Sequence, residues 1–317
     1  MKPILTIAVP LYKEIFIDRL DIIIPQLTNE VKLLIINDNT NLNIETLILK
    51  KYGRIDNLEI INNNKNLGLG TNLSNCFYFT NTKWMWLLGD DDIILDNSIQ
   101  TILNRIKKSN SILIKFSYTH DKPSGQEYTM YKNKQILGLD NLISELYLEK
   151  NDLNIGTMIF MSNSIFNIEK LTPFISIAFK NTYSYAPHFA IILEYLSMNP
   201  TEAIELSEEQ LVINYYPKIE DKWTRFIVAL GILNLQYMIL NISVETYKKL
   251  IKILYKFINF RFIFLSISNT LSTILGLSII KYKNLYKIFS FIKSVLANPF
   301  SYSCLYINFD FGKLSLL

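Results

Sequence analysis

Short apolar runs alternate with segments of helical spacing along the first third of the chain. Strands are predicted where apolar runs have strand length, at 4–9, 32–37, 58–61, 84–88 and 111–117. Helices are predicted where apolar residues recur at helical spacing, at 15–27, 43–52, 69–79 and 97–108. This alternation indicates βαβ units with right-handed crossovers. It predicts an α/β fold with a mainly parallel sheet and helices on both faces.

The pattern after residue 118 is less regular. Strands are predicted at 154–161 and 211–216, and a helix at 187–197 with a proline in its first turn. Long helical patterns rich in apolar residues and lysine follow. We therefore predict a nucleotide-binding domain over 1–217 and a helical, basic and apolar C-terminal region over 218–317.

Charge is distributed unevenly between these two parts. From Lys222 onward there are 12 lysines and arginines and two acids, a net charge of +10, whereas the preceding residues carry −6. A basic and apolar tail favours an anionic membrane surface as a partner more than nucleic acid, which we do not expect to bind. Cys76 and Cys304 are the only cysteines, which excludes a disulfide scaffold and fits a reducing compartment.

Three consecutive carboxylates, Asp90, Asp91 and Asp92, follow the apolar run Trp84–Leu88 and Gly89. Ligands of open α/β sheets lie beyond the carboxyl ends of the strands, where these residues would fall. Hard oxygen ligands suit Mg²⁺ or Mn²⁺. The alternative is a solvated acidic turn before the next helix, and the triplet alone does not separate the two interpretations.

Four segments lie at successive ends of predicted strands, and they read Val9-Pro10-Leu11-Tyr12-Lys13-Glu14, Ile35-Ile36-Asn37-Asp38-Asn39-Thr40, Asn64-Lys65-Asn66-Leu67-Gly68-Leu69-Gly70-Thr71-Asn72 and Gly89-Asp90-Asp91-Asp92. Their order and spacing resemble the family 2 glycosyltransferases of the GT-A fold, which carry V-P-x-Y-N, V-D-D-G-S, N-x-G and L-D-x-D-D. The resemblance covers roughly 4–95 well and extends weakly to about 215. It implies a metal-dependent, inverting transfer of a sugar from a nucleotide-diphosphate sugar, with a UDP donor favoured.

The resemblance also implies roles for single residues. Asp38 would bind the pyrimidine base, and Asp92 and Asp90 would face the metal and the ribose. The remaining donor-binding residues it implies are Pro10, Tyr12, Glu14, Asn66, Gly68 and Asp91.

The sequence departs from the family pattern at several positions. Asn37 replaces the first paired aspartate, Asn39 replaces the glycine, and Gly89 replaces the first aspartate of L-D-x-D-D. Leu73 stands where a basic residue is common. These changes bear on donor binding more than on the fold.

The catalytic base is predicted at the start of a helix in the second half. Family members carry Glu-Asp there, and this chain has Pro187-His188. His188 is chemically competent near neutral pH, so we predict it as the base; the alternative is a histidine that only packs or caps the helix. Glu194 and Asp152 are weaker candidates.

Two other functions stay open from the sequence, a nucleotidyltransferase and a non-catalytic scaffold that binds through the helical tail. A nucleotidyltransferase would normally need a basic Gly-rich loop near the N-terminus, which residues 10–14 lack.

The tail bears on location and partners. Lys248, Lys249, Lys252 and Lys256 cluster toward one side of a predicted helix. We expect a cytoplasmic enzyme, peripheral on the inner face of the membrane, that builds a cell-surface glycan (a capsule, lipooligosaccharide or lipid-linked saccharide). The alternative is a surface helix of a bundle, through which the chain could form an oligomer.

Overall fold

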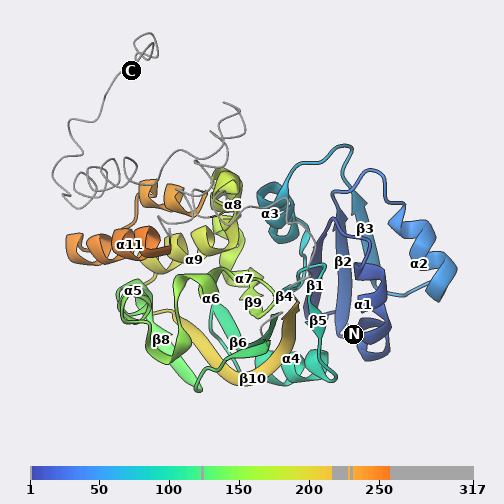
Figure 1. Cartoon of the computed structure of the whole chain (residues 1–317), viewed down its shortest axis with the longest axis horizontal. Helices are drawn as coiled ribbons and strands as arrows, with labels where there is room; N and C mark the ends of the chain where they lie inside the picture. The colour runs from blue at the N-terminus through green and yellow to red at the C-terminus, as the bar shows by residue number, and fades with distance from the viewer. Residues whose placement is uncertain (1, 123–124, 216–227, 229–230, 258–317) are drawn as a thin grey trace, which may run out of the picture. The chain divides into compact units, whose positions relative to one another are not determined.

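In the computed structural model, the strands of the described residues form one ten-stranded sheet (Figure 1). The structure describes residues 2–122, 125–215, 228 and 231–257. The strands are β1 (Leu5–Leu11), β2 (Val31–Asn37), β3 (Leu58–Asn62), β4 (Trp84–Leu87), β5 (Ile93–Ile94), β6 (Leu113–Lys122), β7 (Gly125–Thr129), β8 (Lys134–Leu137), β9 (Ser164–Asn167) and β10 (Ala203–Tyr215). Their order is β3-β2-β1-β4-β9-β6-β10-β5, with β7 paired to β6 and β8 to β10.

Most strands of the sheet run in one direction. β1 is parallel to both β2 and β4, β2 is parallel to β3, and β6 is parallel to β10. β9 is antiparallel to both β4 and β6, so these two also share a direction. Six of the eight strands in the main order therefore point the same way, which confirms the predicted mainly parallel sheet.

Helices cover both faces of this sheet (Figure 1). They are α1 (Phe16–Ile23), α2 (Ile44–Tyr52), α3 (Leu69–Phe79), α4 (Ser98–Ile106), α5 (Gly138–Leu148), α6 (Ile155–Ile159), α7 (Ile168–Leu171), α8 (Ile175–Lys180), α9 (Pro187–Met198) and α11 (Val244–Phe257). Short 3₁₀ turns are η1 (Ile24–Gln26), η2 (Lys150–Asp152), η3 (Thr172–Phe174), η4 (Thr182–Ser184) and η5 (Asn234–Tyr237).

Alternate residues of each central strand serve the two hydrophobic cores, as the period of a β-strand requires. On β2, Leu33 and Ile35 join the core beneath α1, α2 and α4. Leu34 and Ile36 join the core beneath α3, α5, α6, α9 and α11. Burial on both faces explains why this strand reads as a continuous apolar run.

Residues 154–161, predicted as a strand, instead form α6 and the turn after it, so that prediction is wrong. The side chain of Asn154 accepts a hydrogen bond from the N–H of Thr157 at 3.1 Å, and the Thr157 hydroxyl accepts one from the N–H of Asn154 at 3.0 Å. This reciprocal capping box starts a helix where the apolar run alone suggested a strand. Residues 211–215 of the strand predicted at 211–216 are the end of β10, which begins at Ala203, and residue 216 lies outside the described residues.

The first compact unit of the chain extends from Met1 to Asn259. Ile232, Leu235, Leu250 and Leu254 are buried in the same core as α3 and α9. The boundary predicted between 217 and 218 therefore falls inside this unit, because residues beyond it complete the core. Of the predicted C-terminal region, residues 218–227, 229–230 and 258–317 lie outside the described residues.

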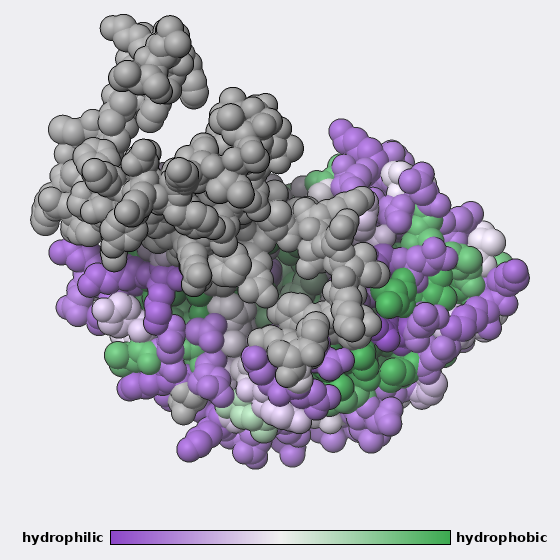
Figure 2. Space-filling view, viewed as in Figure 1, coloured by the Kyte–Doolittle hydropathy of each residue, from purple (hydrophilic) through white to green (hydrophobic). Residues whose placement is uncertain are grey.

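The helix that carries the lysine cluster, α11, packs its apolar side on the protein. Leu250 and Leu254 are buried, whereas Lys248 and Lys252 are exposed. In the part of the chain that the structure describes, no helix combines the length and hydrophobicity needed to cross a membrane. Figure 2 shows the hydrophobic residues of the visible face as separate areas among polar ones.

Candidate active site

The four predicted segments meet at the carboxyl edge of the parallel strands, because β1 to β4 all end there. The side-chain amide of Asn39, after β2, donates to the carbonyl of Tyr12, after β1, at 2.9 Å. The backbone N–H of Asn63, after β3, donates to the carbonyl of Asn37 at 2.9 Å. The structure thus brings residues of these segments within hydrogen-bonding distance although they are up to 78 positions apart in the sequence, as for Tyr12 and Asp90.

Asp38 is buried at the end of β2 and organises the loop before α3. One oxygen, Oδ1, accepts hydrogen bonds from the N–H of Leu67 at 2.7 Å and from the amide of Asn63 at 2.9 Å. The other, Oδ2, accepts one from the N–H of Gly68 at 2.9 Å. A carboxylate has about four acceptor sites, so three such bonds leave room for one more donor. Asn63 directly precedes the quoted motif, and its place in an asparagine run could have marked it.

The asparagines that depart from the family pattern have structural partners here. The amide of Asn37 donates to Oδ1 of Asn62 at 3.0 Å and to the carbonyl of Leu42 at 2.9 Å. Its Oδ1 accepts a hydrogen bond from the N–H of Asn39 at 3.0 Å. An aspartate lacks these amide donors, so asparagine suits a position that ties β2 to β3.

Asp90 points back toward the loop after β1. Its Oδ2 accepts hydrogen bonds from the backbone N–H groups of Tyr12 at 2.7 Å and Lys13 at 2.6 Å. Burial, reinforced by the charge of Asp91, raises the pKa of Asp90 to about 6 despite these two donors. Oδ1 makes no hydrogen bond within the described part of the chain and is the atom available to a ligand.

Asp91 forms an ion pair with Lys13, whose Nζ lies 2.5 Å from its Oδ2. The backbone carbonyl of Asp91 also accepts a hydrogen bond from the guanidinium of Arg19 at 3.4 Å. Asp91 therefore helps to join the acidic turn to the loop after β1 and to α1.

Asp92 is buried beside Ser162, a residue that the sequence did not single out. The Ser162 hydroxyl donates a hydrogen bond to Oδ2 of Asp92 and accepts one from the N–H of Gly89 at 2.8 Å. A side chain at position 89 would crowd this turn, because its Cβ would lie 2.9 Å from Oδ2 of Asp92. Glycine at this departure from the family pattern thus allows Asp92 to reach Ser162.

The start of α3 is shaped by two glycines. Gly68 has φ +81°, a value that glycine adopts readily, and its N–H also bonds to Oδ1 of the exposed Asn66 at 2.9 Å. Gly70 packs against η4, where an added Cβ would lie 1.7 Å from the carbonyl oxygen of Thr182. The first turn of α3 is therefore in direct contact with the segment that leads to α9.

The remaining residues predicted near the donor lie on or just after β1. Pro10 is buried within the strand, opposite Ile36. Tyr12 is 42% exposed at the strand's end, and Glu14 is exposed in the following turn. Of these, Tyr12 both touches the Asp90 carboxylate through its N–H and presents a ring to solvent.

His188 lies in the first turn of α9 and is buried. Its Nε2 lies 2.8 Å from the carbonyl oxygen of Ile159 and acts as the donor there, while Nδ1 is buried without a hydrogen-bond partner among the described residues. Burial lowers the pKa of His188 to about 4, so the imidazole is neutral at physiological pH.

The two weaker base candidates lie elsewhere. Glu194 is on α9 about two turns after His188, and burial raises the pKa of its carboxyl group. Asp152 ends η2, and its Oδ2 accepts a hydrogen bond from the N–H of Met130 at 3.3 Å.

The carboxylate oxygens of Asp90 and Asp92 are suitable ligands for a hard divalent cation, but two carboxylates do not complete its coordination. Within the described ranges, no three or more acidic, histidine or cysteine side chains surround a common point. Mg²⁺ commonly binds through one or two carboxylates together with phosphate oxygens of the substrate. A cation at this site would therefore need oxygens from a bound diphosphate.

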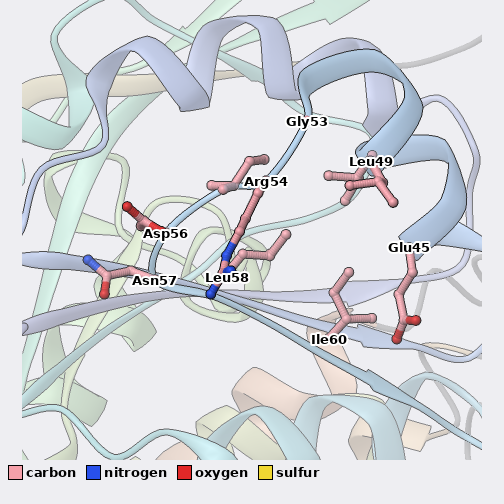
Figure 3. Close-up of a pocket in the computed structure, with 10 residues that line it drawn as sticks. Glu45, Leu49, Gly53, Arg54, Asp56, Asn57, Leu58 and Ile60 are labelled. Carbon is pink, nitrogen blue, oxygen red and sulfur yellow. The ribbon is translucent and has the colours of Figure 1, made fainter.

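A separate hollow of about 470 Å³ lies between α2 and β3 (Figure 3). Its lining includes Glu45, Leu49, Arg54, Asp56 and Ile60. None of the residues predicted for the site lines it, so the hollow and the acidic cluster are different places.

The chain matches the model of glycosyl transferase family 2 over residues 6–169, more than half of its length. The chain belongs to this family. It is therefore a glycosyltransferase, and the matched region contains Asp38, the aspartate triplet and Ser162. No curated protein matches this glycosyltransferase.

Solved structures with the same fold include those of S. aureus TarS. TarS 1-349 in complex with UDP-GlcNAc has a TM-score of 0.56 and 13% identity, over 79% of this glycosyltransferase and 70% of that chain. TarS 1-349 in complex with UDP has a TM-score of 0.53 and 15% identity, over 88% and 76%. At these identities the likeness concerns the fold, and it confirms the predicted GT-A architecture.

Proposed function

We propose that this glycosyltransferase takes a sugar from a UDP-sugar and transfers it, with inversion, to a hydroxyl group of a cell-surface glycan or lipid-linked acceptor. The observation that carries the proposal is the convergence of Asp38, Asp90 and Asp92 at one sheet edge, each buried and each held by defined hydrogen bonds. Family membership and the TarS complexes with UDP and UDP-GlcNAc support a nucleotide-sugar donor over a nucleotidyltransferase or a scaffold.

The residues divide the work of binding the donor. Asp38 orders the loop of Leu67 and Gly68 and keeps one acceptor site for an N–H of the base. Oδ1 of Asp90 is available to the ribose or the metal. Asp92, oriented by Ser162, is the proposed ligand for Mn²⁺ or Mg²⁺. When bound, that cation would neutralise the departing diphosphate.

Inverting transfer also requires a group that accepts the proton of the attacking hydroxyl. We retain His188 as the proposed base. Because its Nε2 donates to the carbonyl of Ile159, Nδ1 is the atom that would take the proton. The low pKa of His188 would make it a weak base, so acceptor binding would have to bring the hydroxyl close to Nδ1.

The acceptor class and the location are proposed from the tail. Exposed Lys248 and Lys252 on α11 would attract an anionic surface by about 1 kcal/mol for each well-placed lysine. The buried Leu250 and Leu254 leave electrostatics as the main contribution of this helix. Flotation with anionic liposomes at low salt tests the membrane partner. If the protein does not bind the liposomes and sediments as an oligomer, the helices of the C-terminal region would instead form a bundle between copies of the chain.

Release of UDP from a panel of UDP-sugars, with and without Mn²⁺, tests the proposed reaction. We expect release from at least one donor, and we expect EDTA to abolish it. No release from any donor under either condition, together with no binding of UDP, would refute the proposal. Release that persists in EDTA would refute only its metal dependence.

A further inference from the structure

Lys115 is the third residue of β6, and its side chain is fully buried, although burying an amine is costly unless it is well bonded. It forms no ion pair within the described part of the chain. Its Nζ is instead surrounded by four oxygens: the carbonyls of Met158 at 3.3 Å and Phe160 at 2.8 Å, Oδ1 of Asn163 at 2.5 Å and Oγ of Ser164 at 2.7 Å.

All four oxygens belong to the segment that leaves α6 and enters β9. Backbone groups in such an irregular buried segment need partners, and Lys115 supplies them. The segment is also fixed to β6 beside the lysine, because the amide of Asn163 donates to the carbonyl of Phe116 at 2.9 Å and the N–H of Phe116 donates to the carbonyl of Asn163 at 2.9 Å.

Ser162 stands in the middle of this segment and is fully buried. Its carbonyl accepts a hydrogen bond from the indole of Trp86 on β4 at 2.7 Å. Its hydroxyl has a single proton, which it donates to Asp92, and it accepts the N–H of Gly89. The orientation of this hydroxyl is therefore set from both sides, and the Asp92 carboxylate is held by it.

We propose that Lys115 is a positioning residue of the active site, which fixes the Asp92 carboxylate through Ser162. The inference rests on the proposed role of Asp92 as a metal ligand. Groups that orient a metal-ligating carboxylate from behind commonly change metal affinity or activity about 10- to 100-fold when removed. Gly89, Asp92 and Ser162 pack closely, because a Cβ added at Gly89 would lie 2.9 Å from Oδ2 of Asp92 and 3.1 Å from Oγ of Ser162.

The test is the affinity for Mn²⁺ in the presence of UDP, measured by calorimetry on Ser162→Ala and Lys115→Met. We expect each variant to bind Mn²⁺ about tenfold more weakly, while thermal unfolding shows that it is folded. The double variant should bind Mn²⁺ no more weakly than the weaker-binding single variant, because both substitutions interrupt the same chain of contacts from Lys115 through Ser162 to Asp92. If Lys115→Met does not fold, Ser164→Ala removes one acceptor of the amine and should shift the affinity in the same direction.

Two matched controls separate positioning from general stability. Ser117→Ala removes another fully buried hydroxyl, which accepts the N–H of Tyr131 and donates to the carbonyl of Ser207. Lys170→Met removes a lysine whose Nζ donates to the carbonyl of Asn110 and to the carboxylate of Glu202, neither of which belongs to the acidic turn. We expect both to lower the unfolding temperature while Mn²⁺ affinity stays within about twofold.

Asp92→Asn in the same series distinguishes the two proposals. Unchanged Mn²⁺ affinity in Asp92→Asn would overturn the metal role of Asp92 and this inference with it. Weak Mn²⁺ binding in Asp92→Asn, with normal binding in folded Lys115→Met or Ser164→Ala, would overturn this inference alone. Losses that add in the double variant would also overturn it, because independent effects imply separate paths.

Discussion

Oδ2 of Asp90 lies 2.6 Å from the backbone nitrogen of Lys13, which joins the acidic turn after β4 to the loop after β1. The carboxylate is buried, and its pKa is raised to about 6 from an ordinary value of 3.8. Ionised Asp90 is therefore disfavoured by the fold. A buried charge kept at such a cost is typical of a functional site.

Replacing Asp90 with asparagine should stabilise the protein at pH 7 and impair turnover. Asparagine keeps an oxygen for the two backbone donors and removes the buried charge, so we expect a gain of about 3 kcal/mol in the free energy of unfolding. The pKa of Asp90 is higher in the folded protein than in the unfolded chain. The wild-type protein therefore loses stability as pH rises from about 3.8 to about 6. Denaturant unfolding at several pH values measures the difference in stability between Asp90→Asn and wild type, and this difference should vanish below about pH 4.

Replacing Asp38 with alanine should lower both stability and affinity for UDP. The change leaves the N–H groups of Leu67 and Gly68 without their acceptor, and we expect a cost of about 2 kcal/mol. Asp56→Ala, at an exposed aspartate of the loop before β3, is the control and should be near neutral. Equal stability and equal UDP affinity in Asp38→Ala and Asp56→Ala would show that Asp38 is an ordinary turn residue.

Replacing Gly70 with alanine should destabilise the fold by about 3 kcal/mol, because the new Cβ would lie 1.7 Å from the carbonyl oxygen of Thr182. Thr71→Ala, one position later on the same helix and partly exposed, should change stability by less than about 0.5 kcal/mol. Chemical denaturation measures both. A neutral Gly70→Ala would mean that α3 and η4 are not in close contact.

His188 should make the protein less stable as pH drops below neutral. Its folded pKa, about 4, is below its ordinary value of 6.5, so the unfolded chain takes up the proton first. The contribution of the neutral imidazole to the free energy of unfolding is complete above about pH 6.5 and is lost as pH falls toward 4. Compared with His188→Gln, wild type should lose about 2 kcal/mol more between pH 7.5 and pH 5. Parallel pH dependence in the two proteins would place the imidazole in water.

The same variant separates the two interpretations of His188. If the imidazole is the base, His188→Gln should lose turnover while it still binds UDP with wild-type affinity. Full turnover in a folded His188→Gln would assign the residue to packing alone.

The elements that the sequence predicts well are those whose local pattern and tertiary role agree. β2 and β4 are continuous apolar runs because both faces are covered, and α3 follows its periodicity from Leu69 to Phe79. α6 was missed because the Asn154 and Thr157 cap outweighs an apolar run. The first half of β10 was missed because Glu205, Glu208 and Glu209 interrupt its apolar alternation.

The residues of the candidate site also divide into those that the sequence could predict and those that it could not. Asp38 and the aspartate triplet can be found because each follows a predicted strand, and parallel strands bring their ends together. Ser162 has no such signal, because its partner Asp92 is 70 residues earlier and its segment has no regular structure. Lys115 reads as an interruption of an apolar strand, and only the packed structure shows the oxygens around it.

The acidic turn is proposed to bind a nucleotide diphosphate together with a metal ion. Calorimetric titration of UDP into wild type and Asp92→Asn, each with Mn²⁺ and with EDTA, tests it most directly. We predict binding by wild type that is lost in EDTA, and binding at least about tenfold weaker in a folded Asp92→Asn protein. Equal UDP affinity in the two proteins, or no binding of UDP by wild type with Mn²⁺, would show that the acidic turn is not a metal-dependent nucleotide site.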